Sequence, residues 1–412
     1  MRMKKFCTIS TSLLLSTFTV FGAGFQLNLQ GVRQLAMGGS GTAYPWDISC
    51  IFYNPACISY MDGFQAYASL VALMPNAQYI SGTYSTRTQA QVFYPFNVYI
   101  GGPLKSNNRI GLGLGIYTPF GSGIKWDDDW TGRYAIRSSN LEAIYFQPTA
   151  SYKINDIFSV GAGLIYAYGN VDVKAAIPVQ SQQGSTDPAS ELSGNANGFG
   201  YNIGLHAKPM KWLQLGLTYR SQVKMKVSNG DASFTDIPES ISNMFPVGTK
   251  FNTSLPLPQV VSFGVAVNAT EKLVVQMDIN YVGWSSIDSL KFDFTNHTQL
   301  LKDNHSPRHY QNTVAIRLGA HYALTDKWAL MAGAAYDPTP VTDGFVSPDL
   351  PDANRIVLTG GLDFKLNRKI NIMAAFEYVT TAKRDGSFDY AGLSGTYQTK
   401  ALSPCLGATY NF

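Results

Sequence analysis

The histidines, serines and cysteines of this 412-residue sequence are not arranged for catalysis. Hydrolysis by a serine nucleophile needs a histidine beside the serine and a third polar group that orients the histidine. His305 and Ser306 are adjacent, but they fall in a predicted loop, and the sequence has five histidines in all. The histidines and cysteines also lack the spacing of a zinc site. We therefore expect no enzyme and no metal or organic cofactor.

Three arginines could instead bind an anionic ligand, because a guanidinium group can hold a carboxylate through two parallel hydrogen bonds. The arginines share the polar faces of predicted strands with three carboxylates: Arg220, Arg317 and Arg355 with Asp278, Asp363 and Glu377. We select Arg317 first as a substrate-binding residue, because His321 lies on the same face of its strand, and Arg220 second. The commoner arrangement is that such charges pair with one another or with a neighbouring segment.

The predicted loop 229–257 contains four large apolar side chains. Ile237, Ile241, Met244 and Phe245 are spaced at i, i+4, i+7 and i+8, which places them on one face of a short helix. An exposed apolar face often marks a binding site. We predict that these residues form the wall of a groove for an apolar substrate. The alternative is that they pack on the rim of their own sheet.

Glycines alternate along the predicted strand 109–118. Gly111, Gly113 and Gly115 remove side chains from one face, and Pro119 removes a backbone donor just beyond them. Such positions suit a kink or a bulge. We predict an opening in the sheet at these glycines. The alternative is that they face inward and make room for another segment.

The elements that position these residues are predicted from alternation with a period of two, which places successive side chains on opposite faces of a strand. Apolar side chains alternate with polar or small ones in 273–281, 370–378 and 405–412, and the last of these segments ends on Phe412. One face of each strand therefore suits lipid and the other suits a polar lumen.

Fourteen such strands can be placed in the chain. They are 64–82, 90–101, 109–118, 143–153, 157–175, 198–208, 211–228, 258–268, 271–291, 310–322, 327–337, 354–365, 369–380 and 400–412. Long and short connections alternate between them, which is typical of an outer-membrane barrel, as is an even number of strands. We therefore predict an all-β fold, a 14-stranded antiparallel transmembrane β-barrel over residues 64–412.

The first 63 residues do not follow the strand pattern. Residues 1–22 combine basic residues with an apolar run from Leu13 to Phe21 that is shorter than the roughly 20 residues needed to span a bilayer. We interpret them as a signal peptide that is cleaved before Ala23. Residues 23–63 are rich in glycine and carry too many apolar side chains for a solvated tail. We predict that they form a hatch, or plug, inside the barrel lumen.

The composition agrees with an exported barrel. Charged residues make up 14% of the chain and aromatic residues 13%. Of the 31 basic residues, three leave with the signal peptide, so 28 remain against 27 acidic ones, which gives no reason to expect nucleic acid as a partner. Cys50, Cys57 and Cys405 stay in the mature chain. A Cys50–Cys57 disulfide and buried free thiols are both open, because spacing alone does not fix the geometry.

Several segments resemble the FadL-type long-chain fatty acid transporters, a family that includes TodX-like importers of aromatic hydrocarbons. Residues 23–28, Ala-Gly-Phe-Gln-Leu-Asn, are similar to the start of that family's N-terminal hatch, and Tyr53-Asn54-Pro55-Ala56 to its Asn-Pro-Ala motif. Further similar segments are Leu217-Thr218-Tyr219-Arg220-Ser221, Leu255-Pro256-Leu257-Pro258, Ala335-Tyr336-Asp337-Pro338-Thr339-Pro340-Val341 and Pro351-Asp352-Ala353-Asn354-Arg355. The resemblance covers nearly the whole mature chain.

The resemblance implies a function and a route. It implies passive outer-membrane uptake of hydrophobic compounds, with extracellular capture and lateral release through a kinked third strand. Long-chain fatty acids are the expected substrate and small aromatic hydrocarbons the alternative. We also predict that Asp337 and Arg355 hold the Asn54, Pro55 and Ala56 end of the hatch. The expected partners are the substrate and outer-membrane lipid, with the protein as a monomer.

Three other functions are known for barrels of this kind. An outer-membrane phospholipase would need a serine beside a histidine in the barrel wall, and this sequence does not place them there. A non-specific porin conflicts with a filled lumen. An adhesin or a purely structural barrel is the third alternative, and uptake of labelled oleate and toluene by cells with and without the protein would distinguish it from a transporter.

Overall fold

The computed structural model describes residues 24–179 and 187–412. The predicted signal peptide, residues 1–22, and the predicted mature start at Ala23 lie outside the described residues. The strands of the described part all belong to one sheet. Within these residues, no helix is long and apolar enough to cross a membrane.

The elements follow one another along the chain with short helices at the start and strands thereafter. The helices are α1 Val32–Ala36 and α2 Cys50–Tyr53, with 3₁₀ helices η1 Pro55–Tyr60, η2 Glu239–Met244, η3 Trp284–Ser286 and η4 Asp389–Ala391. The strands of the first half are β1 Gln65–Val71, β2 Met74–Ser81, β3 Tyr84–Arg87, β4 Phe96–Leu104, β5 Asn107–Lys125, β6 Ser138–Lys153, β7 Phe158–Ala176, β8 Ala189–Met210, β9 Leu213–Arg220 and β10 Val223–Thr235. Those of the second half are β11 Lys250–Leu257, β12 Val260–Asn268, β13 Leu273–Val282, β14 Ser289–Phe294, β15 Asn304–Pro307, β16 Thr313–Ala323, β17 Trp328–Asp337, β18 Arg355–Lys365, β19 Ile370–Thr381, β20 Arg384–Phe388 and β21 Leu393–Asn411.

The sheet closes into a barrel because β1 pairs with β4 on one side and with the last strand, β21, on the other. Seven passages across the barrel are interrupted and are each built from two strands: β1 with β2, β3 with β4, β9 with β10, β11 with β12, β13 with β14, β15 with β16, and β19 with β20. Counted in this way, the described strands make fourteen antiparallel passages, so the predicted strand number is confirmed. Closure joins the first and last strands, so the sheet has no open end to face lipid.

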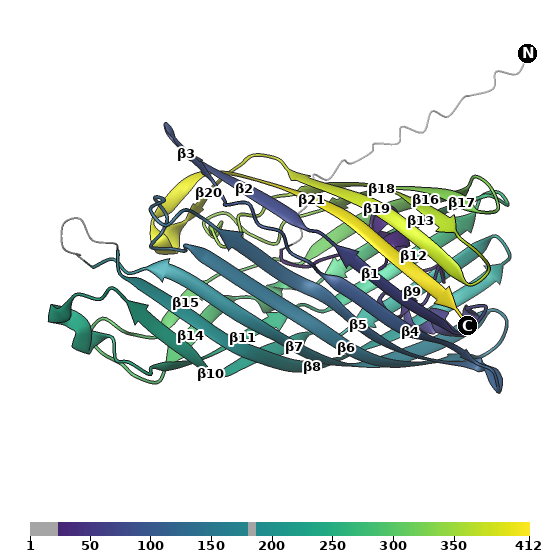
Figure 1. Cartoon of the computed structure of the whole chain (residues 1–412), viewed down its shortest axis with the longest axis horizontal. Coiled ribbons are helices and arrows are strands. Elements are labelled where there is room, and N and C mark those ends of the chain that lie inside the picture. Colours follow the sequence, from purple (N-terminus) through teal and green to yellow (C-terminus); the bar gives the residue numbers. More distant parts are fainter. Residues whose placement is uncertain (1–23, 180–186) are drawn as a thin grey trace, which may run out of the picture.

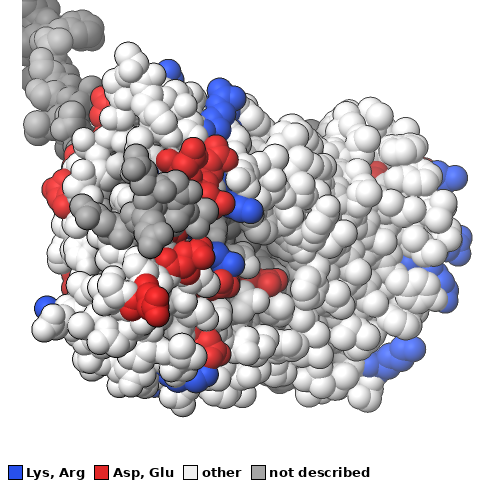
Figure 2. Space-filling model, turned by 60° about the vertical axis from the view of Figure 1, so that its left-hand side comes forward, with Lys and Arg blue, Asp and Glu red and all other residues white. Residues whose placement is uncertain are grey.

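Alternation along the strands separates an apolar outer face from an inner face, as predicted. In β21 the side chain of Leu406 is 65% exposed, whereas that of its neighbour Cys405 is 3% exposed. On the side of the barrel shown in Figure 2, the outward face carries almost no charge over a broad band between the two ends, which appears as white surface. A band of this kind matches the hydrocarbon layer of a bilayer.

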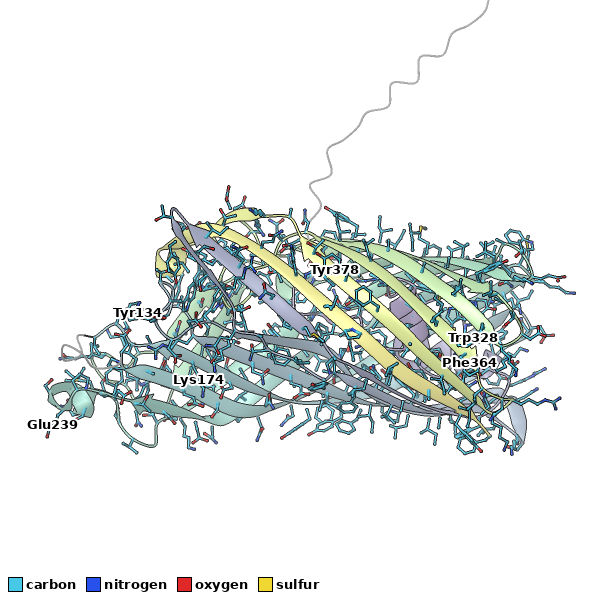
Figure 3. All side chains as sticks on the ribbon, turned by 45° about the horizontal axis from the view of Figure 1, so that its top comes forward. Tyr134, Lys174, Glu239, Trp328, Phe364 and Tyr378 are labelled. Atoms are coloured by element: carbon cyan, nitrogen blue, oxygen red, sulfur yellow. The ribbon has the colours of Figure 1, made fainter. Side chains whose placement is uncertain are left out.

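Aromatic side chains border this band. Trp328 and Phe364 stack with ring centroids 4.3 Å apart at the end of the barrel that has short turns (Figure 3). Towards the opposite end, Tyr201 and Tyr219 lie with ring centroids 5.9 Å apart. Such girdles mark the two interfaces of a membrane barrel. Glu239 of η2 lies far beyond the second girdle, at the tip of the longest projection in Figure 3.

The predicted strand bounds were wrong mainly at the end that carries the long loops. β8 begins at Ala189 rather than at residue 198, and β10 continues to Thr235 instead of ending at residue 228. Outside the bilayer there is no lipid to impose an apolar outer face. The strands therefore continue without the alternation by which they were predicted.

The start of the chain lies inside the barrel. Figure 1 shows the purple segment with α1 and α2 within the half of the barrel that has the short turns. These turns are 105–106, 154–157, 211–212, 269–272, 324–327 and 366–369. The long connections, by contrast, gather at the other end, where β14, β15 and η2 extend the wall.

Candidate functional site

Residues 24–63 form a plug that is packed against the inner wall of the barrel on several sides. Glycines of the wall leave the room that the plug needs. A Cβ atom on Gly161 of β7 would lie 2.5 Å from the backbone of Pro55 and Ala56, and one on Gly333 of β17 would lie 2.2 Å from the backbone nitrogen of Gly38. The wall and the plug are therefore shaped to each other.

Asn54 fastens the far end of the plug. Its Nδ2 donates to the carbonyl oxygens of Thr42 at 2.9 Å and of Leu205 in β8 at 3.0 Å, and its Oδ1 accepts from the backbone N–H of Ala56 at 3.1 Å. Pro55 is the first residue of η1, a position where a backbone N–H would have no partner within the helix. The missing N–H of proline therefore removes no helical hydrogen bond. Asp337 instead pairs with Arg317, and Arg355 binds Asp352 and Gly24. Within the described part of the chain, neither forms a hydrogen bond or an ion pair with residues 54–56, so the prediction that they hold this end was wrong.

Arg355 holds the opposite end of the plug, residues 24–29, which we call the starting segment. Its Nη2 donates to the carbonyl oxygen of Gly24 and to Oδ1 of Asp352, the latter at 2.9 Å. Oδ2 of Asp352 accepts from the backbone N–H of Gly24 at 3.0 Å. Asp352 was missed by the sequence reasoning, although it lies in the Pro-Asp-Ala-Asn-Arg segment on which the resemblance rests. Its carboxylate and the arginine together bind both backbone groups of Gly24.

The guanidinium group of Arg317 binds other residues of the protein. Its Nη2 forms an ion pair with Asp337 at 2.7 Å, its Nη1 donates to the carbonyl oxygen of Gly38 in the plug at 3.2 Å, and its Nε donates to Asn280 at 3.2 Å. His321, the reason for preferring Arg317, instead stacks on Trp46 of the plug with ring centroids 4.6 Å apart. The paired arrangement, the alternative named above, is the one observed.

Arg220 also supports the plug. Its guanidinium carbon lies 4.0 Å from the ring centroid of Phe52, and its Nη2 donates to the carbonyl oxygen of Phe52. Asp278 accepts hydrogen bonds from the backbone N–H groups of Gly41 and Thr42 at 2.8 and 3.0 Å. These charges of the wall therefore bind the plug, and Arg220 lies in neither of the two larger cavities described below.

Arg33 is a charged group of the plug that the sequence reasoning missed. Its guanidinium forms ion pairs with Asp47 at 2.8 Å and with Asp363 of β18 at 2.7 Å. Burial acts to lower the pKa of Arg33, but the two carboxylates outweigh it and raise that pKa above its ordinary value. Asp363 was predicted to face the lumen, and its partner is this residue of the plug.

The cysteines Cys50, Cys57 and Cys405 are buried free thiols. Burial raises the pKa of Cys50 and of Cys57 above the ordinary value of a thiol. Of the two possibilities left open by the sequence, the structure therefore has the free thiols. Cys50 and Cys57 act as small apolar side chains within the plug, and Cys405 does so in β21 of the wall.

The barrel wall is interrupted between β4 and β5. Their pairing ends at Asn97 and Tyr117, and a bulge follows in β5 between Tyr117 and Phe120. Beyond it, the segment 88–95 and the second half of β5 share one backbone hydrogen bond among the described residues, from Gln89 to Lys125. We refer to this interruption as the wall gap.

The starting segment of the plug fills part of the wall gap. The backbone N–H of Leu27 donates to the carbonyl oxygen of Pro119 at 2.9 Å, and that of Gly121 donates to the carbonyl oxygen of Phe25 at 3.1 Å. Gln26 lies opposite Phe120. Residues 25–27 thus pair with the edge of β5 that β4 leaves free.

The opening was therefore predicted at the wrong residues. Gly111, Gly113 and Gly115 are paired with strands on both sides. A Cβ atom on Gly111 would lie 2.7 Å from Ile58, and one on Gly113 would lie 2.6 Å from Ile51. These glycines make room for the plug, which was the alternative reading. Pro119, which was named with them, does lie at the bulge.

An inner cavity of about 510 Å³ lies between the starting segment of the plug and the wall gap. Its lining includes residues 24–29 of the plug, 91–95 and 121–124 beside the gap, and the charged residues Arg317, Asp337, Arg355 and Glu377. The volume is within the range of small-molecule sites, roughly 300–1,000 Å³.

An outer cavity of about 460 Å³ lies towards the long loops. Its lining is mainly apolar and includes Leu255, Phe292, Leu301 and Phe245. Of the four residues predicted to line a groove, Phe245 is in this lining, whereas Ile237, Ile241 and Met244 are not. The predicted helical face is absent, because η2 is a 3₁₀ helix that includes only Ile241 and Met244 of the four.

The two cavities adjoin each other. Six residues line both of them: Phe25, Ser122, Leu141, Glu142, Asp349 and Leu350. Phe25 belongs to the plug and packs against Trp284 and Phe120, with ring centroids 5.1 and 6.0 Å apart. Phe25 therefore lies where the outer cavity meets the inner cavity, and the inner cavity in turn borders the wall gap.

A closed barrel with an uncharged outward band, a plug in its lumen and two adjoining apolar cavities defines a transport barrel of the outer membrane. The chain belongs to the outer membrane protein transport protein family (OMPP1/FadL/TodX), whose model matches residues 13–412. The predicted family and location in the Gram-negative outer membrane are thereby confirmed. The protein is a transport protein and not an enzyme, which excludes the phospholipase.

Relatives and solved structures agree with this assignment. The chain is 25% identical over 406 residues to the long-chain fatty acid transport protein of Salmonella typhi, with 90% of each chain covered. A FadL homologue of Pseudomonas aeruginosa superimposes with a TM-score of 0.82 at 22% identity, covering 95% of this chain and 100% of the other. The toluene transporter TodX of Pseudomonas putida gives 0.72 at 17% identity, covering 93% and 98%. At these identities, the structural matches show the fold.

Proposed function

We propose that this protein carries hydrophobic compounds, foremost long-chain fatty acids, passively across the outer membrane. The substrate enters the outer cavity, passes Phe25 into the inner cavity and leaves sideways through the wall gap. The observation that carries this proposal is that the inner cavity borders the gap, because residues 91–95 and 121–124 line both. The relatives named as long-chain fatty acid transport proteins support the choice of substrate.

A lateral exit suits an apolar substrate. A straight path through the lumen would lead through the plug and into water, and burial of each CH₂ group is worth about 0.8 kcal/mol. Leaving through the wall instead keeps the chain against apolar surface. On this proposal the starting segment of the plug, which pairs with β5 at the gap, must move for each substrate that passes.

Small aromatic hydrocarbons are a second candidate substrate, and one observation favours them. The two arginines of the inner cavity, Arg317 and Arg355, are both ion-paired with aspartates. A fatty acid carboxylate would have to displace one of these pairs, whereas a hydrocarbon needs no cation. The solved toluene transporters TodX and TbuX share the fold.

Uptake of radiolabelled oleate and toluene by cells with and without the protein tests the proposal. The fatty acid proposal predicts that oleate uptake depends on the protein. Dependence of toluene uptake alone would replace it with the second candidate. If neither compound depends on the protein while the barrel is correctly assembled in the outer membrane, the proposed function is wrong.

A further inference from the structure

Three lysines without acidic partners lie together on the outward face of the wall, near the long-loop end. They are Lys224 and Lys226 of β10 and Lys291 of β14. Each side chain is exposed, and the structure records no ion pair for any of them among the described residues. Other lysines of the long-loop end are paired, such as Lys250 with Asp231 and Lys174 with Glu191.

The register of the sheet brings the three lysines together. β8, β10, β11 and β14 lie side by side in the lower left-hand part of Figure 1. Lys226 pairs with Ser254, and the pairing of Thr253 with Phe292 places Lys291 on the other side of Ser254. Two strand spacings of about 4.8 Å separate Lys226 from Lys291, and Lys224 is two residues along the same face.

All three side chains point away from the lumen. In β10 the intervening Met225 and Val227 are buried and line the outer cavity, while the lysines between and beside them are exposed. In β14, Phe292 lines the same cavity from the position after Lys291. The lysines therefore face the surroundings of the barrel and not the transport path.

The lysines lie where the bilayer ends. Lys226 pairs with Asn197 of β8, and the next outward residues of β8 are Phe199, 74% exposed, and Tyr201. These rings belong to the aromatic girdle of the long-loop side. A lysine beside or just above such a girdle is at the height of lipid head groups.

We propose that Lys224, Lys226 and Lys291 form a binding site for the phosphate groups of a lipid in the outer leaflet. Three like charges within about 10 Å repel one another unless an anion lies between them. Their long side chains can converge on one phosphate or on two neighbouring ones. Among the described residues, neither nearby acidic side chain forms an ion pair with the three lysines: Asp293 lies 3.5 Å from His305, and Asp231 binds Lys250.

The experiment uses the full barrel in detergent and lipid A carrying two phosphates as the probe. Surface plasmon resonance gives the Kd of the wild type and of the triple variant Lys224→Gln, Lys226→Gln, Lys291→Gln. We expect the Kd of the triple variant to rise about a hundredfold, since each lysine near an anionic lipid surface contributes roughly fivefold. The matched control replaces Lys211, Lys272 and Lys327, in the short turns of the opposite end, and should bind as the wild type does.

Further measurements test whether binding depends on the positive charge of the side chains, and whether the site binds lipid or free phosphate. The triple Lys→Arg variant keeps the charge and is expected to bind, which also excludes misfolding as the cause of a loss. Phosphate-free lipid A should bind the wild type as weakly as the Gln variant binds lipid A. Equal binding of lipid A by the wild type and the Gln variant would overturn the proposal. Displacement of lipid A by inorganic phosphate at an equal concentration would overturn it as well.

Discussion

The two ends of the plug are fastened in different ways. The end at Asn54, Pro55 and Ala56 is bound through backbone groups of the wall and fits against Gly161 with no space for a Cβ atom. The starting segment, residues 24–29, instead lines the inner cavity and pairs with the free edge of β5. One end is enclosed by the wall, whereas the other borders empty volume on one side.

This difference assigns the two ends different roles. A segment that is enclosed by backbone cannot move without the wall moving, because packed interiors deform little. A segment held by Arg355, Asp352 and a few backbone hydrogen bonds can separate at modest cost, and the adjoining cavity gives it room. We therefore interpret the Asn54 end as an anchor and the starting segment as the part that moves when a substrate passes.

The largest expected effect comes from breaking the anchor. Gly161→Leu places a side chain where the backbone of Pro55 and Ala56 lies 2.5 Å from a Cβ atom, so the plug must leave its seat. A fourteen-stranded barrel without its plug is wide enough for water and ions, and we expect single-channel conductance in planar bilayers to rise by about an order of magnitude. Gly360→Leu is the matched control, because the nearest atom to its Cβ lies 3.7 Å away. Equal conductance of both variants would contradict the role of the anchor.

Asn54→Ala and Arg355→Ala separate the two ends by smaller changes. Asn54→Ala removes the side-chain hydrogen bonds to the carbonyl oxygens of Thr42 and Leu205, each worth about 0.5–1.5 kcal/mol, and should produce conductance flicker through the lumen. Arg355→Ala frees Gly24 and should speed uptake several-fold without that flicker. The two variants are compared by conductance and by initial uptake rate of labelled oleate. Identical changes in both measurements would remove the distinction between the ends.

The smallest expected effect concerns the gap itself. A Cβ atom on Gly123 would lie 2.0 Å from the ring of Phe93, which shows that this ring packs on β5 across the gap. Phe93→Ala should widen the exit and raise oleate uptake about twofold, with the lost apolar contact as the cause. Val98→Ala, on the outward face of β4, serves as the control. Slower uptake by Phe93→Ala would indicate that the ring guides the substrate and does not obstruct it.

The barrel could be predicted from the sequence because lipid imposes an apolar side chain at every second position, as in Leu406, Ala408 and Tyr410. The strands continue past the bilayer in β8 and β10, where that pattern stops, so their outer ends could not be predicted. The Asn54 segment was recognised as part of the plug because Asn-Pro-Ala is a local motif.

The rest of the site depends on contacts between distant parts of the chain. Arg355 and Gly24 are separated by 331 residues, and no local pattern predicts their contact. The position of the opening depends on where β4 stops pairing with β5. The alternating glycines were a misleading signal for the position of the opening. Gly113, like Gly161 and Gly333, is a position where the plug approaches the wall too closely for a side chain.

The central claim, that the starting segment must separate from β5 for a substrate to pass, is tested most directly by locking it. Gln26 and Phe120 lie opposite each other in an antiparallel bridge, where Cα atoms are about 4.5–5.5 Å apart and a disulfide can form. The double variant Gln26→Cys, Phe120→Cys is measured oxidised and reduced, so that the same chain is its own control. The pair Ile80→Cys, Ser85→Cys in the β2–β3 hairpin is the matched disulfide away from the path.

We predict that oxidation of the Gln26→Cys, Phe120→Cys variant abolishes oleate uptake and that reduction restores it, while the hairpin disulfide has no effect in either state. Undiminished uptake by the fully oxidised Gln26→Cys, Phe120→Cys variant would contradict the account.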